Sequence, residues 1–192
     1  MYEYISGILK EARPAYAVID CGGVGYNIRT TVNTYSKISS LQSVTLYTHL
    51  IVREDAHLLY GFFSPEERAI FCQLISVSGI GPNTASVMLS SMTVEEIVTA
   101  IQTDNVNTIQ RVKGIGLKTA QRVVIELKDK VTLGSGVGEF AIAGSSEKEE
   151  ALSALVTLGF VKNQVSKAID KIIAENGRLS VEELIKRALR IL

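Results

Sequence analysis

The chain contains Ser78-Gly79-Ile80-Gly81-Pro82-Asn83-Thr84-Ala85 and, further on, Lys113-Gly114-Ile115-Gly116-Leu117-Lys118-Thr119-Ala120. Both stretches have a Gly-Ile-Gly core and end in Thr-Ala, and their first glycines are 35 residues apart, from 79 to 114. Each Gly-Ile-Gly follows a short apolar helical pattern and opens into a second one, which is typical of two antiparallel helices joined by a tight hairpin. The sequence therefore predicts two helix-hairpin-helix motifs.

The hairpin sequence has the chemistry of a phosphate site. Glycine permits positive φ and close approach of another backbone, so the loop can turn N–H groups toward an anion. The following helix adds unpaired N–H donors and the positive end of its dipole, while the central isoleucine is expected to point inward and hold the turn. Such contacts fix a protein on a nucleic-acid backbone without reading bases. We therefore expect binding that selects DNA structure and not DNA sequence.

Glycine can also occupy such turns for steric reasons alone, but two matched copies favour the DNA interpretation. The predicted phosphate-binding residues are Gly79, Ile80, Gly81, Asn83 and Thr84 in the first copy, and Gly114, Ile115, Gly116, Lys118, Thr119 and Arg122 in the second.

The charge of the chain is balanced overall and uneven locally. Twenty basic and 20 acidic residues give a formal net charge of zero, which argues against a protein that coats DNA through general positive charge. Between residues 111 and 130, however, six basic residues face only Glu126 and Asp129. The six are Arg111, Lys113, Lys118, Arg122, Lys128 and Lys130. The cationic surface is therefore expected around the second hairpin.

Other parts of the sequence limit the class of protein. No apolar run approaches the roughly 18 residues of a membrane span. The start of the chain lacks the basic and apolar regions of a signal peptide, so we expect a cytoplasmic protein without a membrane partner. Cys21 and Cys72 lie far apart without ligand spacing, which favours two reduced, mostly buried thiols over a disulfide or a metal site. Neither a metal nor a cofactor is expected.

Residues 1–63 predict strands. Short β-branched or aromatic runs are separated by glycine or polar clusters, and they cover Tyr2–Lys10, Ala15–Asp20, Tyr26–Val32, Val44–Arg53 and His57–Phe63. Five strands in about 60 residues suggest a small closed barrel of the OB type. This fold is common among nucleic-acid-binding proteins, but it does not establish that function.

The turn between the last two predicted strands is Arg53-Glu54-Asp55-Ala56. Two adjacent acids at a hairpin tip are compatible with an ordinary solvated turn. On a DNA-binding face, Glu54 and Asp55 would instead repel phosphates and exclude duplex from that point.

The rest of the chain predicts helices in two groups. Residues 64–133 form an all-helical domain, with a helix start at Ser64-Pro65 and a capping box at Thr93–Glu96. Residues 134–146 are rich in glycine and small side chains and predict a flexible linker. Residues 147–192 predict a three-helix domain whose small core leaves apolar surface for a partner. The expected fold class is multidomain α+β.

The β-rich start contains Gly22-Gly23-Val24-Gly25-Tyr26 and Val52-Arg53-Glu54-Asp55-Ala56. It is followed by the paired hairpins, the linker and the small C-terminal bundle. In these features the sequence resembles the RuvA family over essentially the whole chain. The resemblance implies a homotetramer, or a pair of tetramers, that holds a four-way DNA junction during recombination and repair. The hairpins would bind the arms, and Glu54 and Asp55 would lie near the crossover.

The resemblance also implies partners and an absence of catalysis. The C-terminal domain, which is UBA-like in this family, recruits a RuvB-type hexameric AAA+ ATPase, and a RuvC-type resolvase joins a larger complex. The family member itself hydrolyses nothing. The family often has lysine at the positions of Asn83 and Leu117, so phosphate affinity in this chain is expected to depend more on Lys118 and Arg122.

Two other interpretations remain open at this point. The second hairpin is also similar to that of DNA glycosylase/lyases, in which a lysine at the position of Lys118 attacks the sugar. That chemistry needs a nearby carboxylate and a pocket for a flipped base, whereas Glu126 and Asp129 follow on the same helix surface. A plain interaction scaffold is the third interpretation, and it explains neither hairpin.

Overall fold

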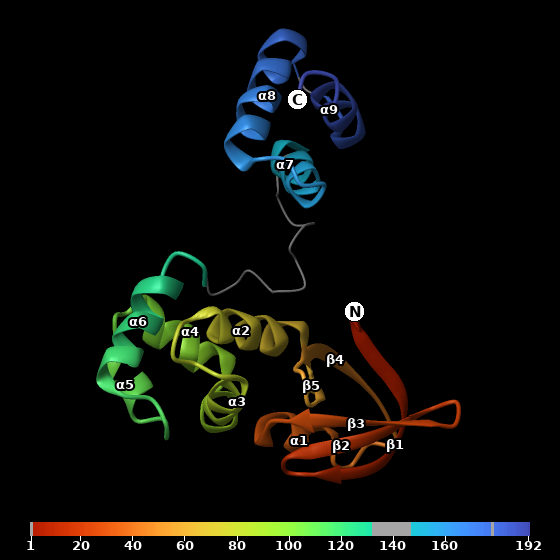
Figure 1. Cartoon of the computed structure of the whole chain (residues 1–192), viewed down its shortest axis with the longest axis vertical. Coiled ribbons are helices and arrows are strands. Elements are labelled where there is room, and N and C mark those ends of the chain that lie inside the picture. Colours follow the sequence, from red (N-terminus) through yellow and green to blue (C-terminus); the bar gives the residue numbers. More distant parts are fainter. Residues whose placement is uncertain (1, 132–146, 178) are drawn as a thin grey trace. The chain divides into compact units, whose positions relative to one another are not determined.

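The structure is a computed structural model that describes residues 2–131, 147–177 and 179–192 (Figure 1). The chain forms two compact units, divided between residues 138 and 139. The first holds a β-barrel and a set of helices, and the second is a three-helix bundle. The predicted fold class is confirmed. The predicted linker, residues 134–146, lies outside the described residues.

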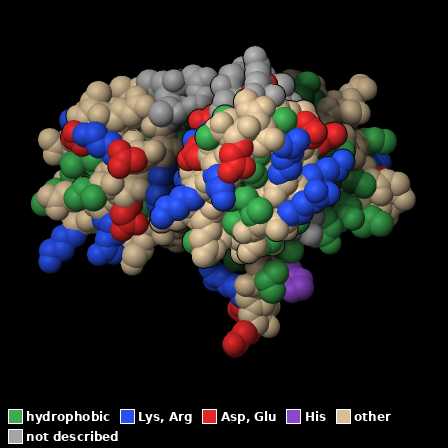
Figure 2. Space-filling view, turned by 90° about the horizontal axis from the view of Figure 1, so that it is seen from above, with side chains coloured by type: hydrophobic (Ala, Val, Ile, Leu, Met, Phe, Trp, Pro, Cys, Tyr) green, Lys and Arg blue, Asp and Glu red, His purple; other side chains and the backbone are tan. Residues whose placement is uncertain are grey.

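Five strands close into a barrel in the order β1-β2-β3-β5-β4, with β1 and β4 also paired. They are β1 (Tyr4–Arg13), β2 (Tyr16–Cys21), β3 (Val24–Thr30), β4 (Ser43–Val52) and β5 (His57–Phe62). Only β3 and β5 run parallel among these pairs. Ile19, Ile28 and Leu46 fill the interior and are fully buried, as alternation along each strand requires. Closure pairs the strand edges, and the β4–β5 hairpin extends as a narrow projection (Figure 2).

The predicted strand Tyr26–Val32 is wrong at its end. β3 stops at Thr30, and Val32 begins a helix, α1 (Val32–Ile38), that the sequence analysis did not predict. The β-branched residues favoured a strand, but the Thr31 side chain accepts a hydrogen bond from the N–H of Thr34 and caps the helix. Ile38, at the other end of α1, is fully buried in the barrel core. Capping and burial together outweigh the local preference.

The helices of the first unit are α2 (Pro65–Ser76), α3 (Pro82–Ser91), α4 (Val94–Gln102), α5 (Val106–Gln110) and α6 (Leu117–Leu127). The predicted starts of α2 and α4 are confirmed. The Ser64 side chain accepts a hydrogen bond from Glu67 N, and Thr93 and Glu96 form a reciprocal capping box. Phe71, Leu74, Met88, Ile101 and Leu127 are fully buried in the core that these helices share. The helix pairs α2–α3 and α5–α6 are the two predicted hairpin motifs.

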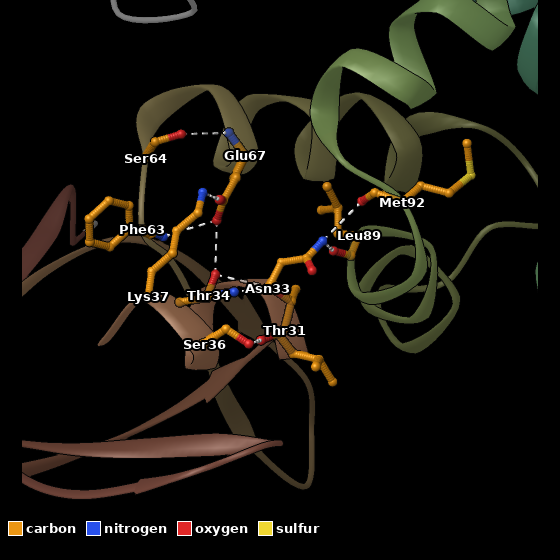
Figure 3. Close-up of polar contacts among 11 residues, drawn as sticks. Thr31, Asn33, Thr34, Ser36, Lys37, Phe63, Ser64, Glu67, Leu89 and Met92 are labelled. Atoms are coloured by element: carbon orange, nitrogen blue, oxygen red, sulfur yellow. Dashed lines mark hydrogen bonds and ion pairs between the residues drawn. The ribbon is translucent and has the colours of Figure 1, made fainter. Parts of the chain in front are cut away.

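Glu67, in the first turn of α2, lies buried against the barrel, with 6% of its surface exposed (Figure 3). Its carboxylate accepts hydrogen bonds from Lys37 Nζ at 2.6 Å, from Thr34 Oγ1 at 2.9 Å and from Phe63 N at 3.1 Å. A buried carboxylate is tolerated when its oxygens are bonded in this way. Glu67 therefore joins α1 and the end of β5 to the start of α2.

Asn33 makes a second connection from α1, directed at the other helix of the first hairpin (Figure 3). Its Nδ2 donates to the carbonyl oxygens of Leu89, at 2.7 Å, and Met92, at 3.1 Å, where α3 ends. Nearby, Val32 N donates to Ser90 Oγ at 3.1 Å. Since α1 is bonded to both α2 and α3, it fixes the orientation of the first hairpin against the barrel.

Both cysteines are free thiols, and each is partly buried against one of the hydrophobic cores. Cys21 Sγ donates to the carbonyl oxygen of Ser6 at 3.1 Å. Cys72 Sγ lies 3.4 Å from His49 Nδ1. Burial raises the pKa of the Cys72 thiol and lowers the pKa of His49, so both groups are held in their neutral forms. This contact belongs to the barrel–helix packing.

The second unit consists of α7 (Glu147–Thr157), α8 (Lys162–Asn176) and α9 (Val181–Ala188). Their core contains the fully buried Ala151, Leu155, Val165, Ile169 and Ala188. Ser180 caps α9, since its side chain accepts a hydrogen bond from Glu183 N. None of the described helices has the length and apolar character to cross a membrane.

The buried Glu67 network predicts a stability effect. Glu67→Gln should lower the free energy of unfolding by about 1–3 kcal/mol, because hydrogen bonds to a charged group are replaced by neutral ones in a buried site. Urea denaturation measures this loss. Glu66→Gln is the matched control, since it also removes an acid from the first turn of α2 and should cost no more than about 0.5 kcal/mol. Equal losses in the two variants would show that the network does not stabilise the contact between the barrel and α2.

Candidate nucleic-acid interface

The two hairpin loops repeat one backbone geometry. Gly79 and Gly114 have φ of 97° and 94°, a region that favours glycine. Gly81 and Gly116 are the N-cap residues of α3 and α6, with φ, ψ of −89°, 169° and −82°, 165°. The resemblance between the two stretches of sequence is therefore also a resemblance in structure.

The isoleucine between the glycines holds each loop closed. Ile80 N donates to the Val77 carbonyl at 3.0 Å, and Ile115 N donates to the Val112 carbonyl at 3.1 Å. Each isoleucine side chain is 5% exposed and packs into the helical core, as predicted. Ile80 and Ile115 thus act as anchors, and they leave the flanking glycines at the surface.

The helices that leave the loops begin without side-chain caps. Gly81 and Gly116 offer no side chain to α3 and α6, which are 10 and 11 residues long. The first-turn N–H groups, which include those of Thr84 and Thr119, are therefore available to an anion at the positive end of the helix dipole. This is the arrangement that the sequence predicted for phosphate.

The loops also lie against each other, a contact that the sequence did not reveal. Arg122 Nη1, from α6, donates to the Ser78 carbonyl at 3.0 Å. A Cβ at Gly79 would lie 3.4 Å from Thr119 Oγ1, so the first loop touches the start of α6. The two hairpins accordingly form one surface, and Arg122 is partly used in joining them.

Charge on this surface belongs to the second hairpin. Lys113 and Lys118 are exposed, and neither takes part in an ion pair among the described residues. Arg122 lies 3.7 Å from Glu126, and Lys128 is paired with Asp104. Lys118 is thus the predicted phosphate ligand whose charge is most available.

The acidic tip is the end of the β4–β5 hairpin. Arg53 N donates to the Ala56 carbonyl at 2.8 Å and closes the turn. Glu54 and Asp55 are exposed and make no ion pair within the described chain. Figure 2 shows the projection ending in acidic side chains, while Lys and Arg side chains at the left, where α5 and α6 lie in Figure 1, reach toward the same side. The tip and the cations thus face one side of the first unit.

Comparison with known proteins gives matches along the chain. Residues 1–61 match the family described as RuvA N terminal domain, residues 71–129 match SAM-like Helix-hairpin-helix tandem, and residues 146–192 match RuvA, C-terminal domain. A relative from Christiangramia forsetii, named Holliday junction branch migration complex subunit RuvA, is 49% identical and covers 99% of each chain. Proteins of the same name from Flavobacterium psychrophilum and Bacteroides fragilis are 47% and 46% identical over 99% of each chain.

The chain belongs to the RuvA family. The resemblance predicted from the sequence is confirmed. Membership in this family decides against the glycosylase/lyase interpretation, and the geometry agrees, because Lys118 is exposed and the Glu126 carboxylate is paired with Arg122. The two regions that match RuvA domains, residues 1–61 and 146–192, lie on either side of the tandem hairpins in the sequence.

Among the described residues, no group of three or more His, Cys, Asp and Glu side chains is placed to hold a metal ion.

The sequence did not reveal the residues that position the first hairpin against the barrel. The strand prediction at Val32 overlooked α1, whose Asn33 donates to the end of α3 and whose Lys37 donates to Glu67 in α2. A Thr-x-x-Thr start followed by a buried Ile38 is the signal that could have revealed this helix.

Proposed function

We propose that this chain binds four-way DNA junctions as the non-catalytic subunit of a branch-migration complex in homologous recombination and DNA repair. The observation that carries the proposal is the pair of adjacent hairpins with the same positive-φ glycine and the same uncapped helix start. Two such sites on one surface can contact successive phosphates along one duplex arm. Because they read no bases, selectivity must come from the geometry of the DNA.

In this proposal two kinds of protein group bind the phosphates, namely backbone N–H groups and basic side chains. Backbone N–H groups of Gly79, Gly81, Asn83 and Thr84 and of Gly114, Gly116, Lys118 and Thr119 supply directional donors, and Lys118 and Arg122 supply charge. A single copy contacts one arm weakly. Four copies around a fourfold axis, or two such tetramers, would contact all four arms at once, so the effective concentration of each site favours the junction.

The C-terminal bundle is proposed to recruit a RuvB-type hexameric AAA+ ATPase that moves the DNA, with a RuvC-type resolvase in a larger complex. Exposed apolar side chains support a docking role. Leu158, Val161 and Ile191 are 63%, 60% and 56% exposed in a bundle of only three helices. Apolar surface of this kind on a small domain is typical of a protein-binding site.

The test is competition between a four-way junction and a linear duplex with the same arm sequences, in fixed low salt. The junction should bind roughly 100-fold more tightly or better, since it can engage several subunits simultaneously. Equal affinity for the two DNA molecules would refute the proposed junction selectivity.

Lys118 should contribute to the salt dependence of binding. Each neutralised phosphate adds about 0.9 to the slope of log K against log salt concentration, so Lys118→Ala should reduce the slope by about that amount per bound subunit. Junction titrations at several salt concentrations measure it. Lys128→Ala is the control, because that lysine is already paired with Asp104 and should leave the slope unchanged. An unchanged slope in Lys118→Ala would remove Lys118 from the phosphate ligands.

Glu54 and Asp55 should limit binding of continuous duplex. Replacing both acids by Gln and Asn should raise duplex affinity by roughly two- to fivefold at low salt and junction affinity by less, because screened repulsion is largest where DNA comes nearest to the tip. The ratio of the two dissociation constants is the measurement. Glu149→Gln with Glu150→Gln removes two adjacent exposed acids from α7 and serves as the control. If the tip variant leaves the ratio unaltered, the two acids form an ordinary solvated turn.

A further inference from the structure

The first hairpin has no cation near its loop. From Ala69 to Val94 the sequence contains no Asp, Glu, Lys or Arg, whereas the second hairpin carries Lys113, Lys118 and Arg122. The two loops nevertheless share their backbone geometry. If both bind phosphate, positive charge for the first must come from another part of the fold.

The barrel places an arginine beside this hairpin. Strand register sets Tyr16 opposite Arg29 on β2 and β3, and Arg29 opposite Tyr60 on β3 and β5. Side chains directly opposite one another on neighbouring strands share a face of the sheet. Arg29 is therefore flanked by two tyrosines in one row across the barrel wall.

Hydrogen bonds connect this row to the first hairpin. Arg29 Nη1 donates to the Tyr60 hydroxyl at 3.3 Å, and its guanidinium carbon lies 5.8 Å from the centre of the Tyr60 ring. The Tyr60 hydroxyl in turn donates to Asn83 Oδ1 at 3.3 Å. Asn83 lies in the first turn of α3, and Tyr60 is only 2% exposed. A fixed aromatic ring thus orients an exposed guanidinium toward the uncapped end of α3.

The surroundings of Arg29 suit an anion. An open hollow of about 630 Å³ lies between the barrel and α3, and among the described residues that line it Arg29 is the only charged one. The other lining residues include Asn27, Asn83, Ser86 and Ser90, which carry neutral hydrogen-bonding groups. None of the ion pairs among the described residues involves Arg29. Glu11, which accepts a hydrogen bond from Tyr16, is already paired with Arg13.

We infer that Arg29 is a phosphate ligand on the barrel, and that it contacts the same duplex arm as the first hairpin. The inference rests on the proposed junction binding and adds a residue outside both hairpin motifs. A guanidinium can bond two phosphate oxygens at once through its planar fork. Arg29 thus supplies the positive charge beside the N–H groups of α3, as Lys118 supplies it beside those of α6.

A purely structural role for Arg29 makes a different prediction. If the guanidinium only packs on Tyr60, its removal lowers stability and leaves the salt dependence of DNA binding unchanged. If it neutralises a phosphate, its removal reduces the salt slope in the folded protein. The salt slope of DNA binding therefore distinguishes the two roles, because packing on Tyr60 does not affect it.

The experiment measures junction affinity against salt concentration for the full-length protein and for Arg29→Gln, at a temperature where circular dichroism shows both to be folded. The slope should fall by about 0.9 per bound subunit, and affinity at low salt should fall roughly tenfold. Arg29→Met, which keeps an apolar stem over Tyr60, should behave as Arg29→Gln does. Arg13→Gln, another exposed barrel arginine, should leave slope and affinity unchanged.

The outcomes separate this inference from the proposed function. If the unmodified protein prefers the junction but both Arg29 variants keep its slope and affinity, Arg29 is no phosphate ligand while junction binding stands. If the unmodified protein shows no preference for the junction, the proposed function fails and the inference fails with it. A reduced slope in both Arg29 variants and an unchanged slope in Arg13→Gln support the inference.

Discussion

A positive φ at one glycine in each hairpin is the constraint on which the DNA-binding surface depends. Gly79 and Gly114 reverse the chain in a conformation that L-residues adopt only with strain, and the isoleucine that follows is thereby directed into the core. The second glycine then starts a helix without a side-chain cap. One turn accordingly anchors the loop and leaves the helix end open to an anion.

The barrel holds the first hairpin in place through hydrogen bonds from α1. α1 bonds through Asn33 to the end of α3 and through Thr34 and Lys37 to Glu67 at the start of α2. Because both helices of the first hairpin are held, the hairpin cannot turn independently of the barrel. The acidic tip on β4 and β5 and the row that contains Arg29 are therefore kept in a fixed position relative to the phosphate-binding loops.

Much of the fold could be predicted because it is encoded locally. The strands follow from alternation, the starts of α2 and α4 from Ser64 and Thr93, and the hairpins from a repeated turn. What could not be predicted depends on contacts between distant residues. The strand prediction at Val32 failed because a Thr31 cap and the burial of Ile38 outweighed β propensity, and the proximity of Arg29 to Asn83 follows only from strand register.

The most direct test of the central claim is backbone amide hydrogen exchange, resolved by residue, with and without a four-way junction. If both loops bind phosphate through their N–H groups, the junction should slow exchange at residues 81–84, where Pro82 carries no N–H, and equally at 116–119, while the β4–β5 tip stays unprotected. Protection at only one loop, or at neither, would contradict the account in which two equivalent hairpins hold the DNA backbone.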